Sequence, residues 1–330
     1  MNHLAYPAPI ASLSAATLER AASLLECGKL VGVPTETVYG LAADATNGAA
    51  VADIFAAKGR PSFNPLICHV ANLEMAERLV VFNELALRLA ERFWPGPLTL
   101  VLPKKCGCSV HDLASAGLET LAVRVPTGPM QQLASMLERP VAAPSANLSG
   151  RISATSAIAV AEDLGSAVAL IIDNGAPTVG VESTIIAVES DELFLLRPGG
   201  LPIEDIEEAT SQKVQEIKPN TGIKAPGMLT SHYAPDMPVR LNIAEVSRNE
   251  ALLSFGDPNI AGTDAAVAEI NLSTRGDLAE AAQNLFSCMR TLNQSGAAGL
   301  AVAPIPETGL GLAINDRLRR AAAPKGVSDE

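Results

Sequence analysis

Cationic, hydroxyl and amide side chains recur in this sequence where apolar runs end. Lys58 and Arg60 close the apolar run AAVADIFAAKG and lead toward Asn64. A guanidinium is a planar fork of donors and an ammonium is a point charge, so this K-x-R string could clamp a phosphate. Two cations also stabilise the C-terminal end of a helix dipole, which leaves a structural role open.

A second string, APSANLSG, places Ser145, Asn147 and Ser149 between a short apolar run and a helix that we expect to begin near Thr155. Small hydroxyl and amide side chains, together with backbone N–H groups before a helix, can form an anion cradle without a P-loop. The alternative is a capped turn with no ligand. The string alone does not separate these interpretations.

Single polar residues also stand within apolar runs or directly after them. Thr37 follows the run LVGVP, and its hydroxyl either binds a ligand or satisfies a turn. Arg124 in LAVRVP and Arg197 in LFLLRPGG must reach solvent or pair with a carboxylate or phosphate. His69 in PLICHV could be a core histidine. Jointly these residues predict one positively charged pocket at strand ends, suited to a nucleoside triphosphate and a small amino or carboxyl substrate.

Common nucleotide and hydrolase signatures are absent from the sequence. It contains no G-x-x-x-x-G-K-[ST], no G-x-S-x-G and no H-E-x-x-H string. Gly309 and Gly311 open a helix-like run without the context of a dinucleotide site, and we interpret them as helix-capping residues. Cys106 and Cys108 are too isolated to form a metal site, and we predict none.

Length and composition restrict the class of protein further. A chain of 330 residues has room for roughly two domains, and 48% hydrophobic residues are typical of a globular protein. The formal net charge of −12 repels polyanions, so an anionic substrate must be held locally. The five scattered cysteines indicate free thiols in a reducing compartment. The sequence shows no export signal and no long apolar run, so we expect a cytoplasmic protein that is not associated with a membrane.

Helix-like and strand-like runs alternate along the chain, which predicts an α/β fold with a twisted mixed sheet. Ser14 and Asn47 are expected to cap two of the helices. We predict a first domain at residues 1–208, a linker at 209–238 and a smaller α/β domain at 239–330. Buried strands are expected at 30–34, 65–70, 98–103, 121–126, 168–173, 183–188 and 193–198.

Seven strings, in order, resemble the threonylcarbamoyl-AMP synthases. These strings are PTETVYGLAADA, KGRPSFNPLICHV, WPGPLTLVL, LAVRVP, APSANLSG, VESTII and LLRPG. The resemblance implies a YrdC-like catalytic domain with a twisted mixed sheet, followed by a linker and a smaller Rossmann-like α/β domain. It implies a nucleotidyltransferase that joins L-threonine, bicarbonate and ATP, with Mg²⁺ carried by the ATP, into threonylcarbamoyl-adenylate and pyrophosphate. A separate transferase complex would then use the adenylate to modify tRNA; whether tRNA binds this chain directly stays open.

The resemblance also assigns roles to individual residues. The residues implied to contact threonine are Thr37, His69, Arg124, Ser145 and Ser183, with Arg124 pairing the threonine carboxylate. The residues implied to contact ATP are Lys58, Arg60, Asn64, Thr120, Asn147, Thr155, Arg197, His232 and Tyr233. Lys58 and Arg60 would be catalytic, by stabilising the charge on the leaving pyrophosphate.

The linker string SHYAP would bring His232 or Tyr233 over the nucleotide as a lid. The family often has basic or aromatic residues between PGM and HYAP, whereas this chain has Leu229, Thr230 and Ser231 there. Whether those three positions contribute a lid contact therefore stays open.

Two rival interpretations belong to other classes. A noncatalytic module that binds double-stranded RNA or the ribosome could use a concave positive surface, although the net charge of −12 disfavours it. A carbamoyltransferase or maturation factor would make a carbamoyl adenylate from another substrate. Family relatives with that role carry additional zinc-finger and acylphosphatase-like parts, and the sequence shows neither.

Overall fold

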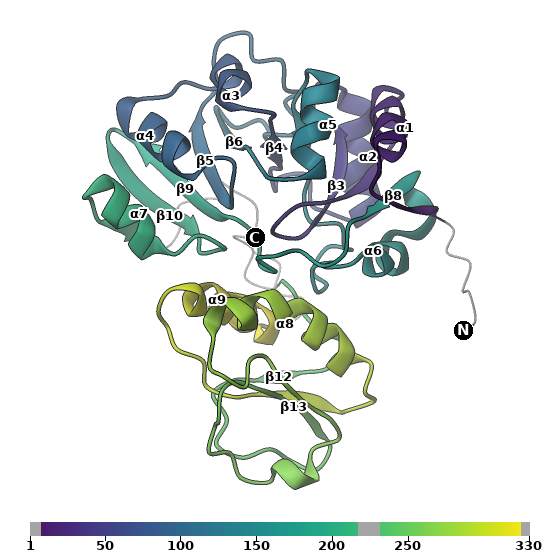
Figure 1. The fold of residues 1–330 in the computed structure, drawn as a ribbon, viewed down its shortest axis with the longest axis vertical. Helices are drawn as coiled ribbons and strands as arrows, with labels where there is room; N and C mark the ends of the chain where they lie inside the picture. The colour runs from purple at the N-terminus through teal and green to yellow at the C-terminus, as the bar shows by residue number, and fades with distance from the viewer. Residues whose placement is uncertain (1–7, 217–231, 325–330) are drawn as a thin grey trace.

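Two separate sheets organise the computed structural model, which describes residues 8–216 and 232–324 (Figure 1). Leu229, Thr230 and Ser231, for which the sequence left a lid contact open, lie outside the described residues. No helix in the two described ranges is long and apolar enough to cross a membrane.

The first sheet has eleven strands within the described residues. Parallel pairs such as β4 with β6 alternate with antiparallel pairs such as β5 with β6, so the predicted mixed sheet is confirmed. The strands, in spatial order, are β1 (Ile10–Ser12), β8 (Leu170–Asp173), β2 (Val31–Pro34), β3 (Tyr39–Asp44), β7 (Val141–Ala142), β4 (Ile67–His69), β6 (Thr120–Arg124), β5 (Leu98–Pro103), β9 (Thr184–Glu189), β10 (Glu192–Arg197) and β11 (Val214–Glu216).

Helices begin and end in this domain where the sequence supplies caps. Asn47 accepts hydrogen bonds from the backbone N–H groups of Ala49 and Ala50, and Gly59 ends the same helix with a left-handed φ of 60°. Ser14 caps the first helix, as predicted. The helices are α1 (Ala15–Glu26), α2 (Gly48–Lys58), α3 (Leu73–Leu79), α4 (Glu84–Phe93), α5 (Pro129–Leu137), α6 (Ala157–Leu164) and α7 (Ile203–Thr210), with a 3₁₀ turn at Gly165–Ala167.

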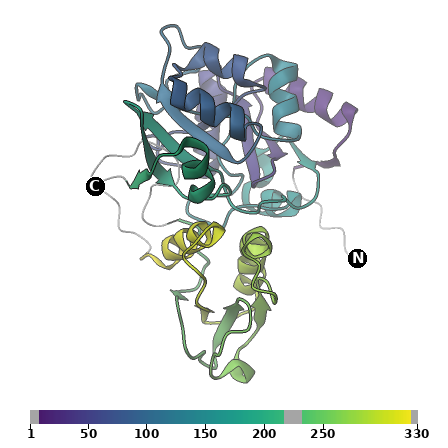
Figure 2. The same ribbon diagram turned by 60° about the vertical axis from the view of Figure 1, so that its left-hand side comes forward.

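The second domain is a small sheet whose two helices face the first domain (Figures 1 and 2). All of its strand pairs in the described residues are parallel, which is typical of the predicted Rossmann-like unit. Its elements are, in spatial order, the strands β12 (Val239–Arg240), β15 (Gly299–Val302), β13 (Glu250–Ser254) and β14 (Glu269–Asn271), and the helices α8 (Leu278–Asn293) and α9 (Leu310–Ala322), with a 3₁₀ turn at Thr263–Ala265.

The two domains share a packed interface. Ile152 and Val181 of the first domain are buried in the same apolar cluster as Phe286 of α8. Arg290 of α8 pairs with Asp163 of α6 at 2.5 Å, with both side chains largely buried. Burial of apolar surface and this ion pair hold α8 against the first domain.

The strand β11 lies within residues 209–238, the segment predicted as a linker. It pairs in parallel with β10 and completes one edge of the first sheet. The second sheet begins at Val239 with β12. Between these strands, the structure describes residues 232–238, and these lie against both domains through contacts given below.

A tight approach of α8 to the first domain yields a stability prediction. Gly180 has a left-handed φ of 79°, and a Cβ placed there would lie 2.3 Å from the Cα of Gln283. Gly175, with a φ of 72°, has open space around it. We expect Gly175→Ala to cost about 1 kcal/mol through backbone strain alone, and Gly180→Ala about 1–3 kcal/mol more through overpacking.

Urea unfolding of the two alanine variants and the wild type measures this difference. Equal losses for Gly180→Ala and Gly175→Ala would show that α8 does not pack against Gly180 in solution.

Candidate active site

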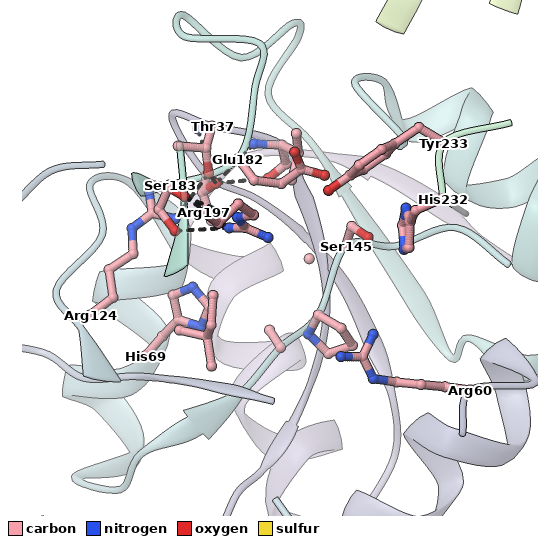
Figure 3. Close-up of a pocket in the computed structure, with 16 residues that line it drawn as sticks. Thr37, Arg60, His69, Arg124, Ser145, Glu182, Ser183, Arg197, His232 and Tyr233 are labelled. Carbon is pink, nitrogen blue, oxygen red and sulfur yellow. Dashed lines mark hydrogen bonds between the residues drawn. The ribbon is translucent and has the colours of Figure 1, made fainter. Parts of the chain in front are cut away.

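A cavity opens where several strands of the first sheet begin or end (Figure 3). The predicted residues that line it are Thr37, Arg60, His69, Arg124, Ser145, Ser183, Arg197, His232 and Tyr233. The structure therefore brings these nine residues together from positions spread over most of the chain.

Strand ends explain why the residues converge. β4, β6 and β10 end at His69, Arg124 and Arg197 respectively, and Ser183 directly precedes β9. Figure 3 shows the guanidinium groups of Arg60 and Arg197 directed toward the middle of the cavity. Pairing of the buried strands thus fixes side chains that are distant in sequence around a common space.

Arg124 is held firmly by the first domain. Its Nε donates to the carbonyl of Gly96 and its Nη1 to the hydroxyl of Thr37, each at 3.0 Å. Its Nη2 forms an ion pair with Oε1 of Glu36 at 2.7 Å. The sequence left solvent, a carboxylate and a phosphate open as surroundings of this arginine, and within the protein its partner is the carboxylate of Glu36.

Arg60 is fixed by the loop that follows it. Its Nε and Nη2 donate to the carbonyl and side-chain oxygens of Asn64, at 3.0 and 2.7 Å, and Nη2 also donates to the carbonyl of Pro65. Asn64 is buried behind Arg60 and does not line the cavity. In this structure Asn64 positions a cavity residue.

Lys58 and Asn147 lie one layer behind the cavity. The Lys58 ammonium donates to the backbone carbonyls of Ser145, at 2.6 Å, and of Asn147. The amide of Asn147 donates to the carbonyls of Leu148 and Arg151, while its Oδ1 lacks a partner in the described part of the chain. The K-x-R and S-x-N strings are therefore in direct contact, and Lys58 fixes the loop that presents Ser145.

Thr120 and Thr155 do not reach the cavity. Thr120 begins β6, whereas the cavity residue Arg124 ends that strand. Thr155 is buried at the start of α6 and lines a separate groove between α6 and α8. A role of these two threonines in ATP binding stays a prediction.

Ser183 and Arg197 form a joined pair on another wall. Arg197 donates from Nε and Nη2 to the Ser183 carbonyl, at 3.2 and 2.9 Å. The Ser183 hydroxyl lies 2.7 Å from that of Thr99. These hydrogen bonds join the start of β9 to the end of β10 beside the cavity.

The cavity holds more positive charge than its surroundings neutralise. Burial, followed by repulsion from Arg197, lowers the pKa of Arg60 to about 9 although Tyr233 opposes the shift. Burial, and after it the charge of Arg60, hold the pKa of Lys58 well below its usual range. Burial also lowers the pKa of Arg197. A bound polyanion would supply countercharge, so these buried cations favour an anionic ligand in the cavity.

The sequence analysis missed two residues of this region. Glu182 lines the cavity, and its carboxylate accepts hydrogen bonds from Ser153 and from Arg317 of α9. Arg317 was detectable, because it falls between Ile314 and Leu318 on the apolar face of a predicted helix. A charge on such a face must find a buried partner.

Metal-ligating side chains do not gather in the described part of the chain. Neither 8–216 nor 232–324 contains a group of three or more His, Cys, Asp or Glu residues placed to hold an ion. Glu36 and Glu182, the carboxylates at the cavity, are each paired with an arginine.

Comparison with known proteins identifies the family. Residues 23–199 match a family model described as "Telomere recombination", and residues 201–323 match "Threonylcarbamoyl-AMP synthase, C-terminal domain". A threonylcarbamoyl-AMP synthase of Pyrococcus abyssi is 42% identical over 92% of this chain and 93% of the relative. This chain belongs to the threonylcarbamoyl-AMP synthase family. A Bacillus subtilis member is 39% identical over 92% of both chains.

The fold of the threonylcarbamoyl-AMP synthase family is confirmed by a solved structure. P. abyssi Sua5 complexed with L-threonine superposes with a TM-score of 0.85 and 39% identity, over 95% of this chain and 96% of the other. The family predicted from seven strings is therefore confirmed. The roles of individual residues in a threonylcarbamoyl-AMP synthase site stay predictions.

Two cavity histidines make stability depend on pH. Burial, and then the charge of Arg124, lower the pKa of His69 to about 3. Below pH 6.5 the unfolded chain therefore takes up a proton that the native state refuses, so the free energy of unfolding falls as pH falls. We expect His69→Gln to remove up to about 1.4 kcal/mol per pH unit of this slope between pH 6 and 4.

Urea unfolding at several pH values measures the slopes of the wild type and the variant. Burial, with the charges of Lys58 and Arg60, also lowers the pKa of His232 to about 3. The variant His232→Gln therefore tests the same effect at a second position. Parallel curves for the wild type and His69→Gln would mean that His69 titrates normally in the folded protein.

Proposed function

We propose that this chain is an L-threonylcarbamoyladenylate synthase of the nucleotidyltransferase class. It joins L-threonine, bicarbonate and ATP and releases pyrophosphate. The observation that supports this most directly is the placement of Arg60, Arg124 and Arg197 around one cavity. A triphosphate and an amino-acid carboxylate each need such a cation, and adjacent placement would bring the two substrates into reacting distance.

The proposed chemistry needs orientation and charge neutralisation more than a protein nucleophile. The threonine amine attacks bicarbonate and forms a carbamate as water leaves, or it attacks the CO₂ derived from bicarbonate and forms the same carbamate as a proton leaves. A carbamate oxygen then attacks the α-phosphorus of ATP in line, and the bond to the β-phosphate oxygen breaks to release pyrophosphate. Negative charge moves onto the leaving group, which Arg60 and Arg197 would stabilise.

Mg²⁺ would enter as part of the nucleotide substrate. Glu36 and Glu182 already balance Arg124 and Arg317, so their oxygens are engaged within the protein. When bound with the triphosphate, Mg²⁺ supplies further neutralisation of the phosphate charge. The residues of this chain supply the remaining positive charge and the geometry.

The threonine end of the site would lie at Arg124, with His69, Thr37, Ser145 and Ser183 around it. Nδ1 of His69 is buried without a hydrogen-bond partner among the described residues. A buried polar atom of this kind costs free energy unless a ligand satisfies it, and a ligand hydroxyl near His69 would do so. The threonine carboxylate would lie beside Arg124, whose guanidinium already faces Glu36.

His232 and Tyr233 would close the nucleotide side of the cavity. The two rings lie 4.1 Å apart between centroids, and both side chains are buried. In Figure 3 they lie on the opposite side of the cavity from Arg124. Covering of the cavity by this pair would keep water from the reactive adenylate.

Substrate selectivity tests how threonine is recognised. A site that bonds the threonine hydroxyl loses only a methyl contact with serine, so kcat/KM should fall about 10- to 200-fold. Valine leaves the buried hydroxyl partners unsatisfied, and kcat/KM should fall by about 10⁴-fold or more. Pyrophosphate release with each amino acid measures both ratios; equal use of valine and threonine would refute recognition of the hydroxyl.

Loss of the K-x-R cations should slow the reaction sharply. We expect Arg60→Ala or Lys58→Ala to lower turnover by roughly two to three orders of magnitude, the usual effect of removing a donor that stabilises developing charge. Lys58 would act through the loop that it fixes, and Arg60 by contact. Arg78→Ala, which removes an exposed helix arginine paired with Glu74, is the matched control and should retain wild-type turnover. Near wild-type turnover of Arg60→Ala would exclude it from the phosphate site.

One assay tests the proposed function against its rivals. The purified protein, with no RNA present, should release pyrophosphate from MgATP only when both threonine and bicarbonate are supplied. Binding of double-stranded RNA without turnover would favour the RNA-binding module instead. Turnover that depends on carbamoyl phosphate and not on threonine would favour a carbamoyltransferase. The product is proposed to pass to a separate transferase complex that modifies tRNA.

A further inference from the structure

A buried arginine of the second domain reaches the wall of the cavity. Arg317 lies on α9 and is wholly buried, at 0% exposure. Its Nε donates to Oε2 of Glu182 at 2.9 Å, and its Nη1 donates to the carbonyl of Pro198 at 2.7 Å. Its guanidinium also lies over the ring of Tyr233, 5.4 Å from the centroid. One side chain thus contacts three segments of chain that are distant in sequence.

Each of these three segments carries a residue of the cavity. Glu182 itself lines the cavity and directly precedes Ser183, while Pro198 directly follows Arg197. Tyr233 lines the cavity and holds a left-handed φ of 61°, which a bulky residue adopts only where its surroundings impose it. Tyr233 also stacks on Phe286 of α8, with centroids 5.5 Å apart. Both helices of the second domain therefore fix the nucleotide side of the cavity.

Glu182 is charged, so its contact with Arg317 is an ion pair between two buried side chains. Burial alone would raise the pKa of Glu182, but the positive charges of Arg317 and then Arg197 lower it to about 2, so it is an anion. Arg317 satisfies that anion directly. Arg197 forms no ion pair with any described residue, although the charges of Glu182 and Arg197 influence each other. Glu182, which lines the cavity with Arg197 and could compete with a phosphate for it, is thus already occupied.

We propose that Arg317 is a positioning residue through which the second domain keeps Glu182 paired and leaves Arg197 free for the triphosphate. Glu182 and Arg197 line the same cavity, and after Arg317 it is Arg197 whose charge acts most strongly on Glu182. Without Arg317, the buried carboxylate therefore captures Arg197. The nucleotide then loses a charged contact, while the threonine side, around Arg124 and His69, is untouched. This inference rests on the proposed function and assigns the second domain to its nucleotide half.

The first test is Arg317→Met, which keeps an unbranched stem as far as the position of Nε but removes the charged guanidinium group. We expect the KM for MgATP to rise about tenfold or more, as for loss of one phosphate contact, with the KM for threonine within about twofold of wild type. The readout is pyrophosphate release that depends on threonine and bicarbonate. An unchanged KM for MgATP, or an equal rise in both KM values, overturns the proposal.

A matched control separates this effect from loss of domain contact. Arg290 also crosses the interface, to Asp163, but neither residue lines the cavity. Arg290→Met therefore removes a buried interdomain ion pair of the same kind. Its KM for MgATP should stay within about twofold of wild type. A rise equal to that of Arg317→Met would show that domain docking alone sets nucleotide affinity, and would overturn the proposal.

A double variant supplies the rescue. In Glu182→Gln with Arg317→Met, position 182 can no longer capture Arg197. Asp316, the other carboxylate paired with Arg317, keeps its ion pair with Arg320, so the protein should fold. Its KM for MgATP should equal that of Glu182→Gln alone within about twofold. A tenfold higher value overturns the proposal, and this comparison decides the question even if Arg317→Met does not fold.

Failure of this inference can be told from failure of the proposed function. If the wild type releases no pyrophosphate with threonine and bicarbonate, the proposed function itself fails. If the wild type does release pyrophosphate and the KM for MgATP is the same with and without Arg317, only the proposed role of Arg317 fails.

Discussion

The cavity depends on arginines that are buried before any substrate arrives. Arg60, Arg124 and Arg197 come from three different parts of the first domain, and the protein neutralises them unevenly. Arg124 has Glu36 beside it, whereas Arg60 is bonded to the neutral oxygens of Asn64 and Pro65. Burying such charges costs free energy unless counter-ions or hydrogen bonds offset it. The sheet and the second domain hold these groups in place, and under the proposed function an anionic ligand would complete the balance.

The second domain takes part in this arrangement through its helices. The partners of Arg317 lie within the wall of the cavity, and Tyr233 is packed between Arg317 and Phe286. The two halves of the chain are therefore linked by the same interactions that shape the site. Without α8 and α9, the first domain would lose the partner of Glu182 and the support of Tyr233.

Many of the strands, helix ends and site loops could be predicted from sequence, because the residues that mark them are close together in the chain. β-branched runs marked the buried strands, Asn47 and Ser14 marked helix starts, and the K-x-R and S-x-N strings marked the loops that meet behind the cavity. What could not be predicted depended on contacts between distant segments. The residues near Lys58 in sequence do not show that its ammonium would donate hydrogen bonds to the backbone carbonyls of Ser145 and Asn147. Pairing of β11 with β10 and of Arg317 with Glu182 likewise required the tertiary structure.

The measurement that bears most directly on this account is a crystal structure of the protein with threonine and an ATP analogue whose α,β-bridging oxygen is replaced by methylene. We expect the triphosphate against Arg60 and Arg197, and the threonine carboxylate at Arg124, in one continuous cavity. A nucleotide bound elsewhere, with these three arginines still facing only protein, would contradict the claim that their charge exists to bring the two substrates together.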